Sequence, residues 1–118
     1  MPTDPKSNLY YESSGPDTAK TIVFLHSGGI AGWMWREQVK AFQPRYHCLI
    51  PDMPVQGKNT TNRTGPYTTE GAADRIADLI RSQAHGGKAH GVGLSEGAQA
   101  VVALLSRYPD VLLLVGYG

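Results

Sequence analysis

The 118-residue sequence is poor in several features that mark particular classes of protein. It has one cysteine, Cys48, so it can form no internal disulfide, which excludes a disulfide-stapled secreted mini-protein. The 11 Lys and Arg residues nearly balance the 10 Asp and Glu residues, and a net charge of +1 gives no electrostatic reason to expect nucleic acid or an anionic membrane as a partner. The longest apolar run, residues 111–115, is far too short to cross a bilayer.

The amino-terminal stretch lacks a targeting signal as well. Residues 1–8 are polar and contain two prolines and no apolar run, so they are expected to form a loose leader and not a signal peptide. Hydrophobic residues make up 41% of the chain, which is enough for one core and, at this length, not for a second. We therefore expect a single domain over residues 1–118, located in the cytoplasm.

What the sequence does contain is a regular alternation of apolar runs and helical patterns. Continuous β-branched runs are typical of strands buried on both faces, whereas apolar residues at every third or fourth position are typical of helices. Strands are predicted over 9–11, 21–25, 46–50, 88–94 and 111–115, helices over 33–42, 69–85 and 95–107, and one long loop over 54–68. This order predicts an α/β fold with a mostly parallel sheet, right-handed crossovers and helices on both faces.

The most specific local pattern is a G-x-S-x-G motif at residues 93–97, between a predicted strand and a predicted helix. A sharp turn there lifts the oxygen of Ser95 above the sheet edge, and Gly93 and Gly97 let the backbone pack against its neighbours. An ordinary glycine turn is the alternative interpretation. The strand–turn–helix context favours a nucleophilic serine.

A second glycine-rich loop, residues 26–29 with the sequence His-Ser-Gly-Gly, follows the predicted strand 21–25. Backbone N–H groups in such a loop can point inward and stabilise an oxyanion that develops on a bound substrate. A plain strand-to-helix connection is the alternative.

Together these motifs resemble the α/β-hydrolase family over residues 9–115, closest to the branch of esterases, epoxide hydrolases and haloalkane dehalogenases. Ser27 stands where the family's loop has its first glycine. The stretches that carry the resemblance are 26–29, 35–38 (Trp-Arg-Glu-Gln), 51–53 (Pro-Asp-Met), 93–97 and 107–110 (Arg-Tyr-Pro-Asp).

The resemblance implies roles for particular residues. Ser95 would be the nucleophile, and the N–H groups of Glu96 and of Gly28 or Ser27 would form the oxyanion hole. The branch with the Trp-Arg-x-Gln stretch usually carries an aspartate nucleophile, so serine at position 95 favours ester chemistry over dehalogenation or epoxide opening. A small-molecule ester is therefore the expected substrate.

The family's catalytic acid and histidine follow its strands seven and eight, whereas this sequence ends after the equivalent of strand six. We therefore expect a minimal, truncated α/β-hydrolase fold with an incomplete triad and weak or promiscuous carboxylesterase activity, since sites without triad members keep about 10³-fold catalysis. A makeshift Asp52–His26–Ser95 relay is an alternative, because these residues follow neighbouring strands.

Other motifs are weaker. The glycines at 91 and 93 begin like a dinucleotide fingerprint, but its third glycine would fall on Glu96, and no Cys/His cluster has metal-ligand spacing, so neither cofactor nor metal is expected. Trp33 and Trp35 are interpreted as core residues or pocket walls.

The predicted strand 111–115 would form an apolar sheet edge without proline or charge to protect it. The expected consequence is a homodimer in which two such edges pair antiparallel. Two alternatives to an active esterase stay open: a catalytically inactive binding or structural module of the same fold, and a fragment of a longer hydrolase.

Overall fold

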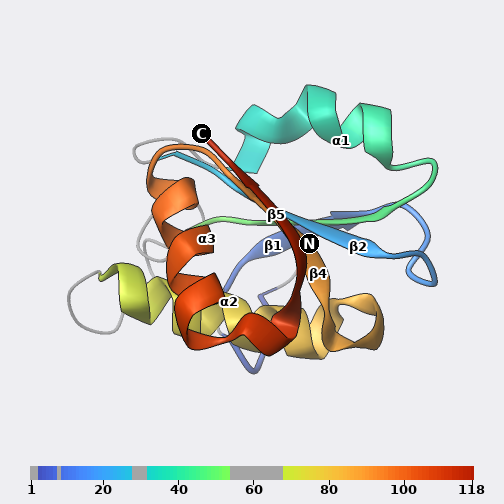
Figure 1. Ribbon diagram of the computed structural model, residues 1–118. Coiled ribbons are helices and arrows are strands. Elements are labelled where there is room, and N and C mark those ends of the chain that lie inside the picture. Colours follow the sequence, from blue (N-terminus) through green and yellow to red (C-terminus); the bar gives the residue numbers. More distant parts are fainter. Residues whose placement is uncertain (1–2, 8, 28–31, 54–67) are drawn as a thin grey trace.

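The computed structural model describes residues 3–7, 9–27, 32–53 and 68–118. Its five strands form one sheet in the order β1-β3-β2-β4-β5 (Figure 1). The strands are β1 (Tyr11–Ser14), β2 (Thr21–Leu25), β3 (His47–Pro51), β4 (Ala89–Gly93) and β5 (Leu112–Tyr117). Only β1 runs antiparallel to its neighbour, and the other pairs are parallel, which confirms the predicted mostly parallel sheet.

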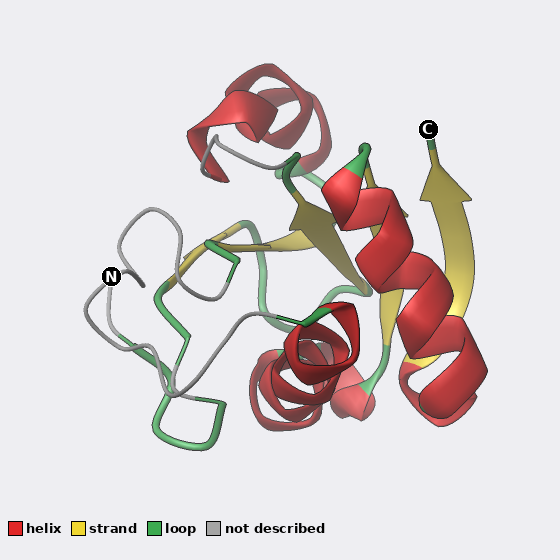
Figure 2. Ribbon diagram, turned by 90° about the vertical axis from the view of Figure 1, so that its left-hand side faces the viewer, coloured by secondary structure: helices red, strands yellow, loops and turns green. Residues whose placement is uncertain are grey.

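Helices cover both faces of this sheet, as predicted (Figure 2). Helix α1 (Arg36–Phe42), preceded by the 3-10 turn η1 (Gly32–Trp35), lies on one face, and α2 (Thr69–Gln83) and α3 (Glu96–Arg107) lie on the other. Two further short turns are η3 (His85–Gly87) and η4 (Pro109–Val111). None of the helices within the described ranges is long and apolar enough to span a membrane.

Alternate residues of the buried strands supply the two layers of the domain's core, one on each face of the sheet. In β2, Val23 and Leu25 join the core under α2 and α3, whereas Phe24 joins the core under α1. The ring of Phe24 lies 5.3 Å, centroid to centroid, from that of Trp35. Because both faces of the sheet are covered, these strands read in the sequence as continuous apolar runs.

The amino-terminal segment differs from the predicted loose leader. The carboxylate of Asp4 is buried and accepts hydrogen bonds from the N–H of Ser7 at 2.7 Å, the amide of Gln83 at 2.8 Å and the hydroxyl of Ser82 at 2.9 Å. These contacts anchor residues 3–7 to the last turn of α2. The polar composition of this segment predicted a loose leader because it contains no apolar anchor. The group that anchors it is instead a buried carboxylate whose hydrogen bonds are satisfied.

Strand boundaries differ from prediction by one residue at each end of β3 and β4 and by more at the first and last strands. The first strand lies at Tyr11–Ser14 and not at 9–11, since the buried Leu9 precedes the antiparallel pairing with β3. The last strand runs on to Tyr117 and has an irregular register against β4, where Ala89 pairs with Leu112 but Gly91 with Val115. Most of the predicted loop 54–68 lies outside the described residues.

Candidate active site

Ser95 lies at the point where β4 ends and α3 begins. Its backbone has φ 57° and ψ −111°, and among the described residues it is the one non-glycine residue with positive φ. Side chains other than glycine rarely adopt this conformation, which costs of order 1 kcal/mol or more and recurs at functional sites. The turn is therefore as sharp as the G-x-S-x-G pattern predicts.

The two glycines of the motif are required by backbone packing. A Cβ atom on Gly93 would lie 2.3 Å from the carbonyl oxygen of Gly97, and a Cβ atom on Gly97 would lie 2.1 Å from that of Leu25. Neither backbone oxygen can move aside without shifting a strand or a helix. The close packing of β4, α3 and the end of β2 thus depends on these positions.

Backbone hydrogen bonds fix the turn on both sides. The N–H of Leu94 donates to the carbonyl of Leu25 at 3.2 Å, and the N–H of Ser95 donates to the carbonyl of Gly118 at 2.8 Å. The N–H of Gly97 donates back to the carbonyl of Leu94 at 2.9 Å. Ser95 itself is exposed, so the turn presents its hydroxyl to solvent at the carboxyl edge of the sheet.

The predicted oxyanion donors are described in part. Glu96 is the first residue of α3, and the first amides of a helix point out of its N-terminus. The N–H of Ser27 lies 3.3 Å from the sulfur of Met34, to which it donates. Gly28 lies outside the described residues. The sequence does not predict this contact, because the position of Met34 in the chain gives no sign that its thioether accepts a hydrogen bond from a backbone N–H.

His26 is buried and holds two loops together. Its Nδ1 lies 2.7 Å from the carbonyl oxygen of Ser27, and its Nε2 lies 2.8 Å from the backbone nitrogen of Met53. A carbonyl can only accept and an N–H can only donate, so Nδ1 carries the proton and Nε2 the lone pair. Both ring nitrogens are therefore engaged with backbone.

This geometry speaks against the Asp52–His26–Ser95 relay. His26 has no ring nitrogen left for Ser95, and in the described part of the chain the hydroxyl of Ser95 makes no hydrogen bond. Asp52 is buried next to β3, and its N–H donates to the carbonyl of Tyr10 at 3.0 Å. The structure thus indicates that His26 positions the loops after β2 and β3, whereas the relay suggested from the sequence would have made it the base.

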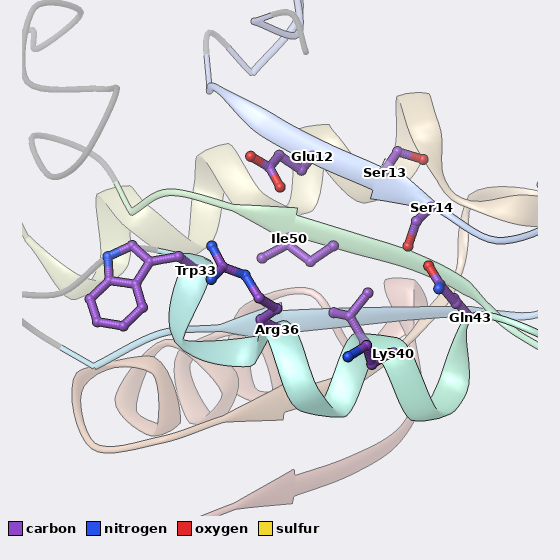
Figure 3. A pocket seen from close by; sticks show the side chains of 9 residues that line it. Glu12, Ser13, Ser14, Trp33, Arg36, Lys40, Gln43 and Ile50 are labelled. Atoms are coloured by element: carbon purple, nitrogen blue, oxygen red, sulfur yellow. The ribbon is translucent and has the colours of Figure 1, made fainter.

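The two tryptophans of η1 have different surroundings. Trp35 is 8% exposed and belongs to the core under α1, so its interpretation as a pocket wall is replaced by a core role. Trp33 is 64% exposed and lines a pocket of about 310 Å³ between β1, β3 and α1 (Figure 3). None of the described residues that line this pocket belongs to the elbow, residues 93–97.

Comparison with known proteins indicates the same family as the geometry of the turn at Ser95. Residues 20–115 match the family of the alpha/beta hydrolase fold. An AB hydrolase superfamily protein of Gibberella zeae is 32% identical over 109 residues, covering 92% of this chain and 38% of that protein.

Two solved structures have the same arrangement of elements. An esterase from Thermogutta terrifontis superposes with a TM-score of 0.83 at 25% identity, covering 92% of this chain and 39% of that one. An enol-lactonase from Burkholderia xenovorans LB400 superposes with a TM-score of 0.81 at 30% identity, covering 91% and 41%.

The chain thus spans about two fifths of the length of the relatives it matches. The match covers every strand from β2 to β4, most of β5 and the turn that carries Ser95. With the strand order, the strained serine and the two obligatory glycines, it leads to one conclusion: this chain belongs to the α/β-hydrolase family.

Proposed function

We propose that Ser95 is the nucleophile of a serine hydrolase that cleaves carboxylic esters. The observation that carries this proposal is the strained, exposed Ser95 between two glycines that admit no side chain. Backbone strain of this kind needs a compensating reason, and holding a hydroxyl above the sheet edge is such a reason.

In the proposed reaction, the oxygen of Ser95 attacks the acyl carbon of the ester. The N–H of Glu96, with that of Gly28 or Ser27, stabilises the negative charge on the former carbonyl oxygen. The alcohol leaves with a proton, and water then hydrolyses the acyl-serine to the carboxylic acid. If Ser27 contributes its N–H, the contact with Met34 must open on substrate binding.

We propose that the activity of the 118-residue chain is weak. Within the described residues no base contacts Ser95, and a serine without a base is a poor nucleophile. Its hydroxyl proton would pass to solvent, which restricts substrates to small esters with good leaving groups. The names of an esterase and an enol-lactonase among the structural relatives favour acyl–oxygen cleavage as the chemistry.

The test compares hydrolysis of para-nitrophenyl acetate by the wild-type chain, by Ser95→Ala and by Ser106→Ala. Ser106 is an exposed serine on α3, so its variant controls for unspecific acyl transfer to surface hydroxyls. We expect Ser95→Ala to lose the rate above background and Ser106→Ala to keep it. Equal rates for the wild type and Ser95→Ala would contradict the proposal.

A fluorophosphonate probe gives a second readout. It is expected to label the wild type and Ser106→Ala but not Ser95→Ala, as measured by intact-protein mass spectrometry. A well-folded wild-type chain that resists labelling would instead favour a non-catalytic binding module of the same fold.

A further inference from the structure

The pocket between α1 and the β1 edge of the sheet is built separately from the elbow. Its floor comes from β1 and β3, where Glu12 pairs with Ile50, and its wall comes from α1. Figure 3 shows Trp33 and Arg36 at one end and Ser14 and Gln43 at the other. The pocket therefore has two chemically different ends.

The first end is cationic. Arg36 lies at this end, and Lys40 leaves the same face of α1 one turn further along, nearer to Gln43 (Figure 3). Within the described residues neither forms an ion pair, whereas Glu12 across the pocket accepts a long hydrogen bond of 3.4 Å from the hydroxyl of Tyr10. Two cations facing one carboxylate leave an excess of one positive charge, which suits a single anionic group.

The second end offers neutral hydrogen-bonding groups. The hydroxyl oxygen of Ser14 is buried and has no hydrogen-bond partner in the described part of the chain. A buried polar atom without a partner is unusual and costs free energy, which a ligand hydroxyl would recover once the Ser14 side chain rotates toward the pocket. The side-chain amide of Gln43 lies beside it and can donate or accept.

Between the two ends the lining is apolar. Val39 and Ile50 lie there, and the exposed ring of Trp33 adds a flat surface at the Arg36 end. From Arg36 to Gln43, α1 advances seven residues, or about 10 Å at 1.5 Å per residue. A volume of about 310 Å³ is at the lower end of small-molecule pockets.

We propose that this pocket binds an organic monocarboxylate with an apolar body and a hydroxyl at its far end, of the hydroxyaryl-alkanoate class. The carboxylate lies against Arg36 with Lys40 one helical turn away, the body covers Ile50 and Val39, and the hydroxyl meets Ser14. The site is independent of Ser95, so it stands whether or not the chain is an esterase.

Isothermal titration calorimetry with para-hydroxyphenylpropanoate tests the proposal on the whole chain. A dissociation constant of about 1 mM or below is expected for a ligand of this size. Phenylpropanoate, which lacks the hydroxyl, is expected to bind about fivefold more weakly. The matching amine, para-hydroxyphenylpropylamine, is expected to give no measurable binding. Equal affinity for the amine and the carboxylate would overturn the proposal, as would the absence of saturable binding up to about ten times the expected constant.

Variants then assign each end. Arg36→Gln is expected to lower the affinity for both carboxylate ligands by about threefold to fivefold. The effect is this small because the charge is exposed and screened. Ser14→Ala is expected to reduce the affinity for the hydroxylated ligand to that for phenylpropanoate without lowering the melting temperature, because the lost hydroxyl has no partner within the described chain. Ser95→Ala is expected to change nothing, and binding lost in that variant would place the ligand at the elbow and refute a separate site.

Discussion

At the scale of single residues, the elbow shows how little freedom the chain has around its reactive group. Ser95 is exposed, yet the backbone on both sides of it is held by contacts with Leu25, Gly97 and Gly118. Such a constraint fixes the backbone and Cβ of Ser95, and the hydroxyl oxygen keeps only its rotation about χ1. It also concentrates sensitivity to mutation in two positions without side chains, Gly93 and Gly97.

Gly97→Ala is expected to lower the free energy of unfolding by about 1–3 kcal/mol, because the added methyl group overpacks a backbone that cannot yield. Gly116→Ala is the matched control, since a Cβ atom there meets nothing within 4 Å. Its effect is expected to stay within about 0.5 kcal/mol. Urea unfolding of the three proteins measures both values, and equal stability of Gly97→Ala and the wild type would show that the elbow can relax.

At the scale of elements, a polar network joins the amino-terminal ends of β2 and β3 to the carboxyl-terminal end of β1. His47 in β3 is buried, and its ring nitrogens lie 2.9 Å from the hydroxyl of Ser13 in β1 and 3.0 Å from that of Thr21 in β2. The hydroxyl of Thr21 also accepts the N–H of His85 at 2.9 Å. One imidazole thus links β1, β2, β3 and the turn after α2.

Burial lowers the pKa of His47 below its ordinary value of 6.5, with His85 adding to the effect and Asp17 opposing it. The unfolded chain therefore binds more protons than the folded chain as the pH falls below about 6.5. The free energy of unfolding thus keeps its full value above that pH and decreases as the pH drops through it. His90 in β4 acts in the same direction, because burial and the charge of Lys20 lower its pKa too.

His47→Gln tests this linkage. Urea midpoints of the wild type are expected to fall between pH 7 and pH 5, and those of His47→Gln to fall less, since only His90 remains to titrate from a lowered pKa among the histidines with resolved shifts. The loss of the hydrogen bonds lowers the stability of the variant at all pH values, so the slope with pH is the diagnostic quantity. Parallel slopes would show that His47 is protonated equally in both states.

At the scale of the whole molecule, the exposed edge at β5 is the feature with the largest consequence. Leu114 is 70% exposed, Leu113 and Tyr117 are exposed as well, and Val102 and Leu105 are exposed on the neighbouring helix α3. An apolar patch beside a strand edge favours association. We propose, as the sequence led us to expect, that two copies pair antiparallel through β5.

Light scattering or sedimentation measures this directly. The wild type is expected to have twice the mass of one chain, and Leu114→Lys is expected to shift it to the monomer. Gln38→Lys introduces the same charge on α1 and is expected to leave the dimer intact. A monomeric wild type would contradict the pairing, and so would open-ended aggregation, because a two-fold pair closes on itself.

The sequence predicted the central strands well because Thr21–Leu25 and His47–Pro51 are buried on both faces, so each is apolar after its first residue. It predicted the elbow because a sharp turn requires particular small residues. It could not separate Trp33 from Trp35, since a 3-10 turn places one outward and the other in the core. Nor could it assign His26, whose partners depend on where the fold brings Met53.

The hydrogen bonds around Gly118 have a consequence for the order of events during synthesis. The N–H of Ser95 donates to the carbonyl of Gly118, and the N–H of Gly118 donates to the carbonyl of Gly93, at 2.8 Å and 3.1 Å. More than twenty residues separate the elbow from this partner in the sequence. A nascent chain whose residue 118 has not left the ribosomal exit tunnel therefore lacks both hydrogen bonds, so it carries the G-x-S-x-G motif without this part of the support of Ser95.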